Sequence, residues 1–469
     1  MAIADQLDRL NVLRQNLADT LTTKGVTAAS TEGFETLVPK VAEIKVSVCV
    51  IKITFDSAFV GQSYTVTDGN GDTKTGIVPE SCVDSVSVAN CNTTYTISAA
   101  VGGVTYSNTV TTGAYYGEYT ATLLTAKIYG VQWDGTSTTA WTRTDDAALF
   151  TDPVPYVSGA SSYGSPFDNL QPWAGMERVT DSAAGELVKI PKFWYKWTQS
   201  GNTLKLQISN GAQDGFFVSP AHADRGDGKG ERDVVYVGRY QSCSTYKSTT
   251  GQAPKVSITR SAARSGITAL GSGIYQFDIA MWVTIQMLYL VEFADWDSQV
   301  KIGYGCGSSS AVQNVGASDS MPYHTGTMQN SRTTFGLGVQ YRYIEGLWEN
   351  VYYWLDGCYY NSNGLNIVKN TANFSDTANG TAVGTPTDGY PSAMSVATVS
   401  GLEWVIYPTA ANGSNTTYVS DIWAFDANSP CLRVGGYYSQ GMHRGLFFVG
   451  CNTAADAKAN IGCRLQELP

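Results

Sequence analysis

The residues best suited to chemistry lie between Cys431 and the end of the chain, and the chemistry they suit is ligand contact. Glycines frame a short stretch of unlike side chains, which are Tyr437, Tyr438, Ser439, Gln440, Met442, His443 and Arg444. A half-buried strand would alternate apolar and polar residues, and this stretch does not. Rigid aromatic groups beside small polar groups and arginine on a glycine-held backbone are typical of binding loops.

Candidate catalytic residues are few. The chain has three histidines, His222, His324 and His443, and none has a second histidine four residues on or a neighbouring cysteine, as a zinc site would require. The sequence also lacks a nucleophile-elbow motif, a P-loop and a dinucleotide-binding glycine motif. We therefore expect no enzyme activity.

One charged, glycine-rich segment offers oxygen ligands. Asp224, Asp227 and Glu231 lie within residues 221–233 and are candidate ligands for a hard cation such as calcium. A solvated loop is the plainer interpretation. The turn at 68–72 lacks the glycine and glutamate of an EF-hand loop. We expect no cofactor, with calcium as the weak alternative.

Composition limits the partners and the compartment. The 469-residue chain has only 15% charged residues and a net charge of −10, so a nucleic-acid partner is not expected, because phosphate binding needs a basic face. Nine cysteines contain no C-x-x-C pair, and the N-terminus has no apolar signal segment. The longest apolar run, 279–294, is too short to cross a bilayer. We expect folding in a reducing cytoplasm, with mostly buried thiols and no membrane insertion.

The elements that must position the C-terminal stretch fall into three predicted segments. Residues 3–21 should form a helix, because Ile3, Leu7, Leu10, Leu17 and Leu21 follow heptad spacing. This helix could form a coiled coil or dock on a partner. We assign residues 1–44 to attachment or oligomerisation.

Residues 45–125 change to a period of two. Alternating runs such as 46–55 and 94–100, separated by turn residues at intervals of about 8–12 residues, predict a small β-sandwich. Such a module resembles the immunoglobulin-like or prealbumin-like spacers of phage fibres.

Residues 126–469 form the largest predicted unit. Residues 186–198 predict one strand that pairs with 204–209, and 278–300 predicts a helix with Asp278 as its N-cap. Many short aromatic strands and few helices indicate an α+β fold that is mostly β.

The C-terminal motifs resemble a known family. The segments Arg433–Gly436 (RVGG), Gly445–Val449 (GLFFV) and Ile461–Leu465 (IGCRL) resemble the variable region of retroelement-diversified proteins, which end in a C-type-lectin-like fold. The resemblance covers residues 432–465 and implies a diversified ligand-binding face that also includes Phe448, Gly450, Cys451 and Thr453. An ordinary glycine-rich surface hairpin is the alternative.

A second resemblance lies upstream. Residues 341–360 resemble the central motif of the formylglycine-generating-enzyme-like branch of that fold, and the matching positions are Glu345, Trp348, Asn350, Val351, Trp354, Asp356 and Gly357. The oxidising enzymes of that branch use two closely spaced cysteines. Here the late pair, Cys451 and Cys463, is twelve residues apart, which argues against that activity.

The opening residues, from NLADTLTTKGV (Asn16–Val26) to TEGFETLVPKVAEI (Thr31–Ile44), also resemble N-terminal segments of phage tail and baseplate-attached proteins. Together these resemblances imply a phage tail receptor-binding protein of the tropism-determinant type, carried on the virion and made in the host cytoplasm. The implied partners are a bacterial surface receptor, protein or glycan, other tail proteins and two further copies in a homotrimer. The alternatives are a structural tail or baseplate component without a receptor, and a sulfatase-modifying-type oxidase.

Overall fold

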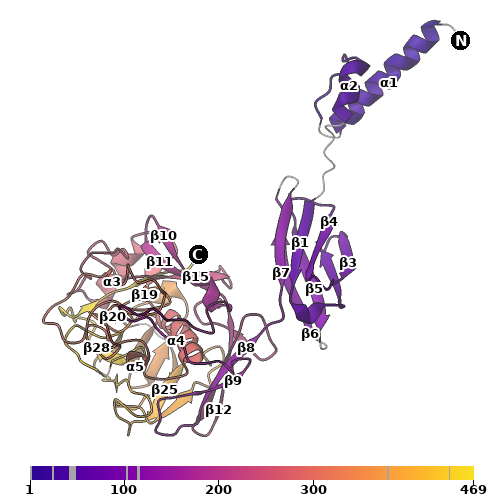
Figure 1. The fold of residues 1–469 in the computed structure, drawn as a ribbon. Helices are drawn as coiled ribbons and strands as arrows, with labels where there is room; N and C mark the ends of the chain where they lie inside the picture. The colour runs from indigo at the N-terminus through magenta and orange to yellow at the C-terminus, as the bar shows by residue number, and fades with distance from the viewer. Residues whose placement is uncertain are drawn as a thin grey trace. The chain divides into compact units, whose positions relative to one another are not determined.

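The computed structural model describes residues 3–23, 26–41, 49–101, 104–113, 117–377, 380–442 and 444–469. The chain is mostly β with few helices, and it divides into two compact units, Met1–Thr125 and Ala126–Pro469 (Figure 1). The predicted boundary near residue 45 lies outside the described residues. Among the described residues, none of the helices combines the length and the apolar character needed to cross a membrane.

The first unit begins with two helices, α1 (Ile3–Thr23) and α2 (Phe34–Lys40). The predicted N-terminal helix is therefore confirmed. Ala18 and Leu21 of α1 are buried with Leu37 of α2 in a small apolar cluster. The C-terminal part of the heptad face is thus covered by the chain itself.

The N-terminal part of the same face has a different environment. Leu7 and Leu10 are each more than half exposed, as is Leu13 beside this face. Arg14, which occupies the next heptad position, donates through Nη1 to the carbonyl oxygen of Glu32 at 2.9 Å. Arg14 therefore lies at the boundary between the C-terminal part of α1, which packs against α2, and the solvent-exposed N-terminal part.

The rest of the first unit consists of two sheets that share one apolar core. One sheet has the order β4-β1-β7 and the other β3-β2-β5-β6. Their bounds are β1 (Cys49–Phe55), β2 (Ser63–Thr67), β3 (Thr73–Ile77), β4 (Val83–Val88), β5 (Thr94–Val101), β6 (Val104–Thr111) and β7 (Glu118–Leu123), with a short 3-10 turn, η2, at Ser57–Phe59. Side chains of β1 alternate between core and surface, as the period of two predicts.

One expectation about the cysteines is wrong. Cys49 on β1 forms a disulfide with Cys91, whereas we expected free thiols. The alternation of β1 turns Cys49 into the core, where Cys91 meets it. The other seven cysteines are free, and all of them except Cys82 and Cys451 are buried.

The second unit contains three five-stranded sheets. The first is β10 (Glu177–Asp181), β11 (Gly185–Pro191), β15 (Val234–Gly238), β30 (Leu465–Glu467) and β16 (Ile274–Gln276). The second is β14 (Phe217–Val218), β12 (Trp194–Ser200), β13 (Thr203–Ser209), β8 (Ile128–Trp133) and β9 (Thr142–Asp145). The third is β26 (Trp423–Ala424), β28 (Val449–Asn452), β27 (Cys431–Val434), β20 (Tyr352–Trp354) and β29 (Ile461–Gly462).

Smaller elements complete this unit. There are three small sheets. The first consists of β17 (Gly326–Thr327), β18 (Val339–Tyr341) and β19 (Ile344–Glu345), and the second of β21 (Cys358–Asn361), β22 (Gly364–Ile367) and β23 (Thr381–Gly384). The third consists of β24 (Ala393–Val396) and β25 (Ile406–Ala410). The helical elements are α3 (Arg260–Thr268), α4 (Ile279–Phe293), α5 (Ser298–Lys301) and the 3-10 turns η3 (Trp173–Gly175) and η4 (Thr371–Asn373).

Helix α4 is the centre of the core. All its residues are buried, as expected for a helix that is apolar on every side. Asp278 caps it as predicted, because its side chain accepts a hydrogen bond from the backbone N–H of Met281 at 2.9 Å. The helix ends at Phe293, earlier than the predicted Val300, because Ala294 adopts a left-handed conformation with φ of 50°.

The segment predicted as one strand, 186–198, is two strands in different sheets. β11 pairs with β15, and β12 pairs with β13, where Trp194 lies opposite Ser209. The strand breaks after Pro191, and Phe193 is fully buried where the chain crosses from one sheet to the other. The predicted pairing of 204–209 with the second half of this segment is confirmed.

Candidate functional site

The C-terminal stretch is a hairpin with a long loop. β27 pairs antiparallel with β28, so that Cys431 lies opposite Asn452 and Val434 opposite Val449. β20 pairs with the other edge of β27, with Tyr353 opposite Val434. Residues 435–448 therefore leave and re-enter the sheet at one place, and the sheet fixes both ends of the loop.

The tip of this loop rests on a second loop. The backbone N–H of Tyr438 donates to the carbonyl oxygen of Asn350 at 2.9 Å, and that of Gly441 donates to the carbonyl oxygen of Gly307 at 2.8 Å. The carbonyl oxygen of Tyr438 accepts from the N–H of Ser309 at 2.5 Å. Because these contacts use backbone atoms, the side chains of the loop can be substituted while the loop keeps its position.

The returning arm is held by a buried carboxylate. Asp421 is 1% exposed and accepts hydrogen bonds from the N–H groups of Gly445 and Phe447, the latter at 2.9 Å. Burial raises the pKa of Asp421 to about 7. A Cβ at Gly445 would lie 2.4 Å from the Oγ of Ser298, which explains the glycine at this position.

Aromatic rings and guanidinium groups converge below the loop. The ring of Tyr352 on β20 lies 5.2 Å from that of Tyr437 and 5.3 Å from that of Phe448. The guanidinium of Arg433 lies 4.0 Å from the centre of the Tyr352 ring, and that of Arg444 lies 4.6 Å from the Phe448 ring. These distances are within the range of cation–π attraction.

The two arginines have no ion-pair partner within the described part of the chain. Arg433 donates through Nε to the side-chain oxygen of Asn452, but its Nη1 and the Nε of Arg444 are buried without a partner. The nearby carboxylate of Asp456 accepts from Asn452 at 2.6 Å. Burial lowers the pKa of each arginine to about 10, so both remain charged at neutral pH.

A cleft of about 230 Å³ opens at these arginines. Its lining includes Tyr352, Arg433, Tyr437, Gln440, Arg444, Asn452, Lys458 and Asn460. The hydroxyl group of Tyr352 donates to the side-chain oxygen of Gln440. The cleft thus combines cations, amides and aromatic faces, and an anionic group is the chemical complement of its unpaired guanidinium groups.

The structure places most predicted contact residues at the surface of this region. Ser439 and Thr453 are exposed, while the half-buried set is Tyr437, Tyr438, Gln440, Met442, Arg444 and Cys451. His443 lies outside the described residues.

The predicted contact role is wrong for two residues. Phe448 is fully buried, and its ring stacks on Tyr352 and supports the loop. Gly450 is buried within β28, where an added Cβ would lie 2.9 Å from the Phe448 ring and 3.3 Å from the Arg433 guanidinium. Both residues belong to the frame of the hairpin and cannot touch a ligand.

The sequence does not indicate several residues of the cleft, which include Lys458 and Asn460. The motif places Arg433 in the RVGG frame, the aromatic pattern favours a core position for Tyr352, and no pattern gives Asn452 a role. In the hairpin register Arg433 lies opposite Gly450, and this glycine leaves room for the guanidinium. That pairing is visible once the hairpin is aligned, but nothing in the sequence connects Tyr352 to it.

Residues of the segment 341–360, which carries the second predicted resemblance, hold loops in place. Glu345 accepts hydrogen bonds from the N–H and Oγ of Ser318 at 2.8 Å and 2.5 Å. Asp356 forms a two-point ion pair with Arg264 at 2.6 Å and 3.0 Å. Asn350 adopts φ of 71° and exchanges two side-chain hydrogen bonds with the backbone of Gln313 at 2.9 Å.

The late cysteines lie on different strands. Cys451 is on β28 and Cys463 follows β29, and β27 and β20 separate these strands in the sheet. Burial raises the pKa of each thiol to about 12, so neither is a thiolate at neutral pH.

The predicted cation ligands do not form a cluster. Asp227 pairs with Arg232, and Glu231 lies 3.9 Å from the Nζ of Lys192. Across the described ranges, no group of three or more His, Cys, Asp or Glu side chains is arranged to hold a metal ion.

No protein-family model matches this chain, and no curated protein sequence is similar to it. The resemblances of the C-terminal motifs therefore remain predictions from the residues.

Proposed function

We propose that the chain is a phage tail receptor-binding protein whose C-terminal unit recognises an anionic group on a bacterial surface. Recognition takes place at the loop 437–444 and the cleft beneath it. The observation that carries the proposal is the pair Arg433 and Arg444, which are largely buried against aromatic rings with no carboxylate partner in the described chain. An unpaired buried charge is costly, and an anionic ligand would compensate it.

The geometry of the cleft supports a carboxylate or phosphate as the anionic group. Arginine presents parallel N–H donors that match two oxygens of such a group. Tyr437 and Tyr438 lie at the edge, with their rings 5.3 Å apart and nearly perpendicular. Tyrosine and arginine are the residue types that most often dominate binding energy, so these four residues are the proposed main contacts.

The rest of the chain fits presentation of this site. In the proposal, the C-terminal unit has a C-type-lectin-like fold, the two-sheet module of the first unit is an immunoglobulin-like spacer, and α1 attaches the protein to tail proteins and sister chains. Leu7 and Leu10 would pack against the same residues of two further copies. Three linked sites would raise a weak affinity through effective concentration.

Diversification of the loop is a separate part of the proposal. The variable side chains at 437–440 are exposed or half-buried, whereas the flanking strands are buried, so substitutions at the loop would leave the core intact. Sequencing the DNA downstream of the gene tests this point. An imperfect repeat of the codons for 433–465, differing mainly at adenines and followed by a reverse-transcriptase gene, is expected. Absence of a repeat would reduce the protein to a fixed adhesin.

Competition for host adsorption tests receptor binding. The purified full-length protein should block adsorption of the phage particle that carries it, and the double variant Tyr437→Ala/Tyr438→Ala should block at least about tenfold less well. The double variant should keep the thermal transition of the wild type within a few degrees. If the wild-type protein does not compete, the chain is a structural tail component without a receptor.

A further inference from the structure

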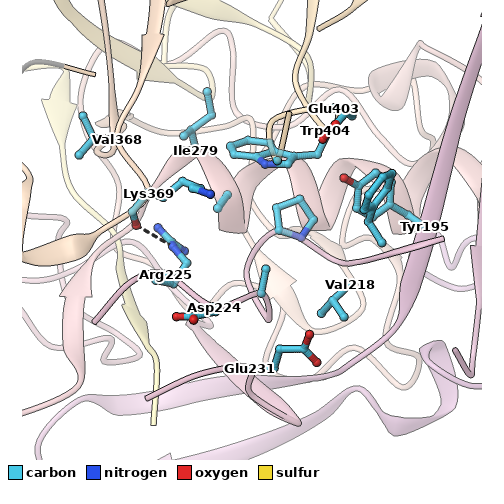
Figure 2. A pocket seen from close by; sticks show the side chains of 15 residues that line it. Tyr195, Val218, Asp224, Arg225, Glu231, Ile279, Val368, Lys369, Glu403 and Trp404 are labelled. Carbon is cyan, nitrogen blue, oxygen red and sulfur yellow. Dashed lines mark hydrogen bonds between the residues drawn. The ribbon is translucent and has the colours of Figure 1, made fainter. Parts of the chain in front are cut away.

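A second cavity lies in the C-terminal unit, apart from the hairpin cleft. It has a volume of about 230 Å³, and none of its lining residues comes from the segment 431–469. Figure 2 shows Arg225 and Lys369 on one side of the space and Tyr195 on the other, with Trp404 and Glu403 above them in the view.

Arg225 is a fixed donor in the wall of this cavity. The residue is 3% exposed, and its Nη2 lies 2.5 Å from the Oδ2 of Asp278, the N-cap of α4. Its Nε donates to the carbonyl oxygen of Lys369 at 2.8 Å. The remaining nitrogen, Nη1, is buried without a partner. Because this guanidinium is already held in place, its unused nitrogen could donate to a ligand oxygen without the entropic cost of immobilising the side chain.

Glu403 supplies an unused acceptor. Its Oε2 is buried without a hydrogen-bond partner. Burial and, secondarily, the charge of Glu403 raise the pKa of Tyr195, and both residues line the cavity. The Tyr195 hydroxyl is therefore protonated at neutral pH and adds a further polar group to the same wall.

The remaining lining is apolar and aromatic. Trp404 is 6% exposed and Phe217 is 49% exposed, so one ring lies deep and the other lies toward solvent. Ile279 and Ala280, in the first turn of α4, contribute aliphatic surface. The volume is below the roughly 300–1,000 Å³ of sites for drug-sized ligands, and it limits the ligand to about one ring.

We propose that this cavity binds a neutral sugar ring. Each sugar hydroxyl both donates and accepts, so one ring can satisfy the acceptor of Glu403 and the donor of Arg225 together, while its apolar face packs on Trp404. An acidic sugar is disfavoured because the lining carries three carboxylates, Asp224, Glu231 and Glu403, against two cations. This inference does not rest on the proposed function, because it concerns other residues and an uncharged ligand.

Ligand-observed NMR tests the proposal on the full-length protein. The probes are glucose, galactose, mannose, N-acetylglucosamine and rhamnose, with galacturonic acid as the charged comparison. Saturation transfer to at least one neutral sugar is expected at millimolar concentration, as is a change in tryptophan fluorescence from Trp404. Glu403→Gln should weaken that binding by about tenfold, the cost of one charge-assisted hydrogen bond.

Two further variants separate a lost site from a lost fold. Lys369→Gln replaces an exposed cavity residue and should weaken binding with an unchanged thermal transition. Arg332→Gln, at an exposed position that lines neither cavity, should leave sugar binding unchanged. The proposal is overturned if no neutral sugar shows saturation transfer, if galacturonic acid binds the Arg433→Gln/Arg444→Gln variant more tightly than the neutral sugars do, or if the folded Glu403 and Lys369 variants bind as well as the wild type.

Discussion

The C-terminal segment contains two kinds of arginine, which differ in their hydrogen-bond partners. Arg464 is fully buried, and its two Nη groups donate to four backbone carbonyl oxygens, those of Gly238, Arg239, Glu345 and Gly346, at 2.6–3.1 Å. Arg464 also lies over an aromatic ring, that of Tyr353, and leaves only its Nε without a partner. Arg433 and Arg444 lie over aromatic rings with donors unused and without such a set of backbone carbonyl partners in the described residues. The difference teaches that burial of a cation does not define its role. The partners of its N–H groups separate a residue that holds loops together from one that is available to a ligand.

The aromatic residues show the same division. Phe448 is fully buried, whereas Tyr437 is half-buried, although both rings lie within 5.3 Å of the Tyr352 ring. Both residue types suit a binding face, but only Tyr437 can reach a ligand. Residues that support the loop and residues that can contact a ligand therefore lie within a few positions of each other in the sequence.

The largest expected effect concerns Arg464. Arg464→Met removes the donors of four carbonyl groups and should lower the free energy of unfolding of the C-terminal unit by roughly 4 kcal/mol or more. Arg444→Met, the matched variant, should change it by less than about 1 kcal/mol, because it removes an unpaired charge and keeps an apolar contact. Denaturant titration measures both. Equal losses of unfolding free energy in the two variants would contradict the distinction between the two kinds of arginine.

A pH-dependent effect should follow from Asp421, which holds the returning arm of the loop. Its pKa in the folded state, about 7, is above that of an unfolded chain. Its contribution to stability is thus complete below about pH 4 and is lost as the pH rises to 7. Relative to Asp421→Asn, the free energy of unfolding of the wild type should fall by up to about 4 kcal/mol over that interval.

The control for this prediction is the neighbouring carboxylate. Burial raises the pKa of Asp297 to about 6, and the charge of Asp297 contributes to the raised pKa of Asp421, so the comparison is repeated with Asp297→Asn present in both proteins. Denaturation curves at pH 4, 5, 6 and 7 provide the measurement. Parallel pH profiles of the two proteins would contradict the assignment.

A smaller effect on stability is expected in α1. Leu10→Glu places a charge on the open part of the helix and should leave the thermal transition nearly unchanged, since Leu10 is exposed in the single chain. It should convert a trimer to monomers in sedimentation equilibrium. Asp8→Asn, at an exposed position of the same helix, is the control. A wild-type protein that sediments as a monomer would refute self-association through α1.

Much of the fold could be predicted from local patterns. The heptad spacing of α1, the alternation of the first-unit strands and the N-cap of α4 are properties of neighbouring residues. The end of α4 could not be predicted, because the left-handed Ala294 follows no sequence signal. The break after Pro191 depends on which distant strands pair with each half.

The site could be predicted only in part. Glycine framing identified the loop, because the backbone contacts of Gly441 and the crowding at Gly445 are local requirements. The cleft could not be found, because it joins Tyr352 to Arg433 and Arg444 across distant parts of the chain. The inward direction of Phe448 likewise follows from its stacking on Tyr352.

The central claim is that Arg433 and Arg444 bind an anionic surface group. The most direct measurement is retention of the full-length protein on immobilised polygalacturonate and on a polyglycerol-phosphate teichoic acid. The wild type should bind at least one of these polymers, and binding should weaken with salt. Arg433→Gln/Arg444→Gln should bind at least about tenfold less, while Lys229→Gln/Arg332→Gln, which removes the same charge from exposed positions, should bind as the wild type does. Binding that survives the first double variant, or is lost equally in the second, would contradict the account.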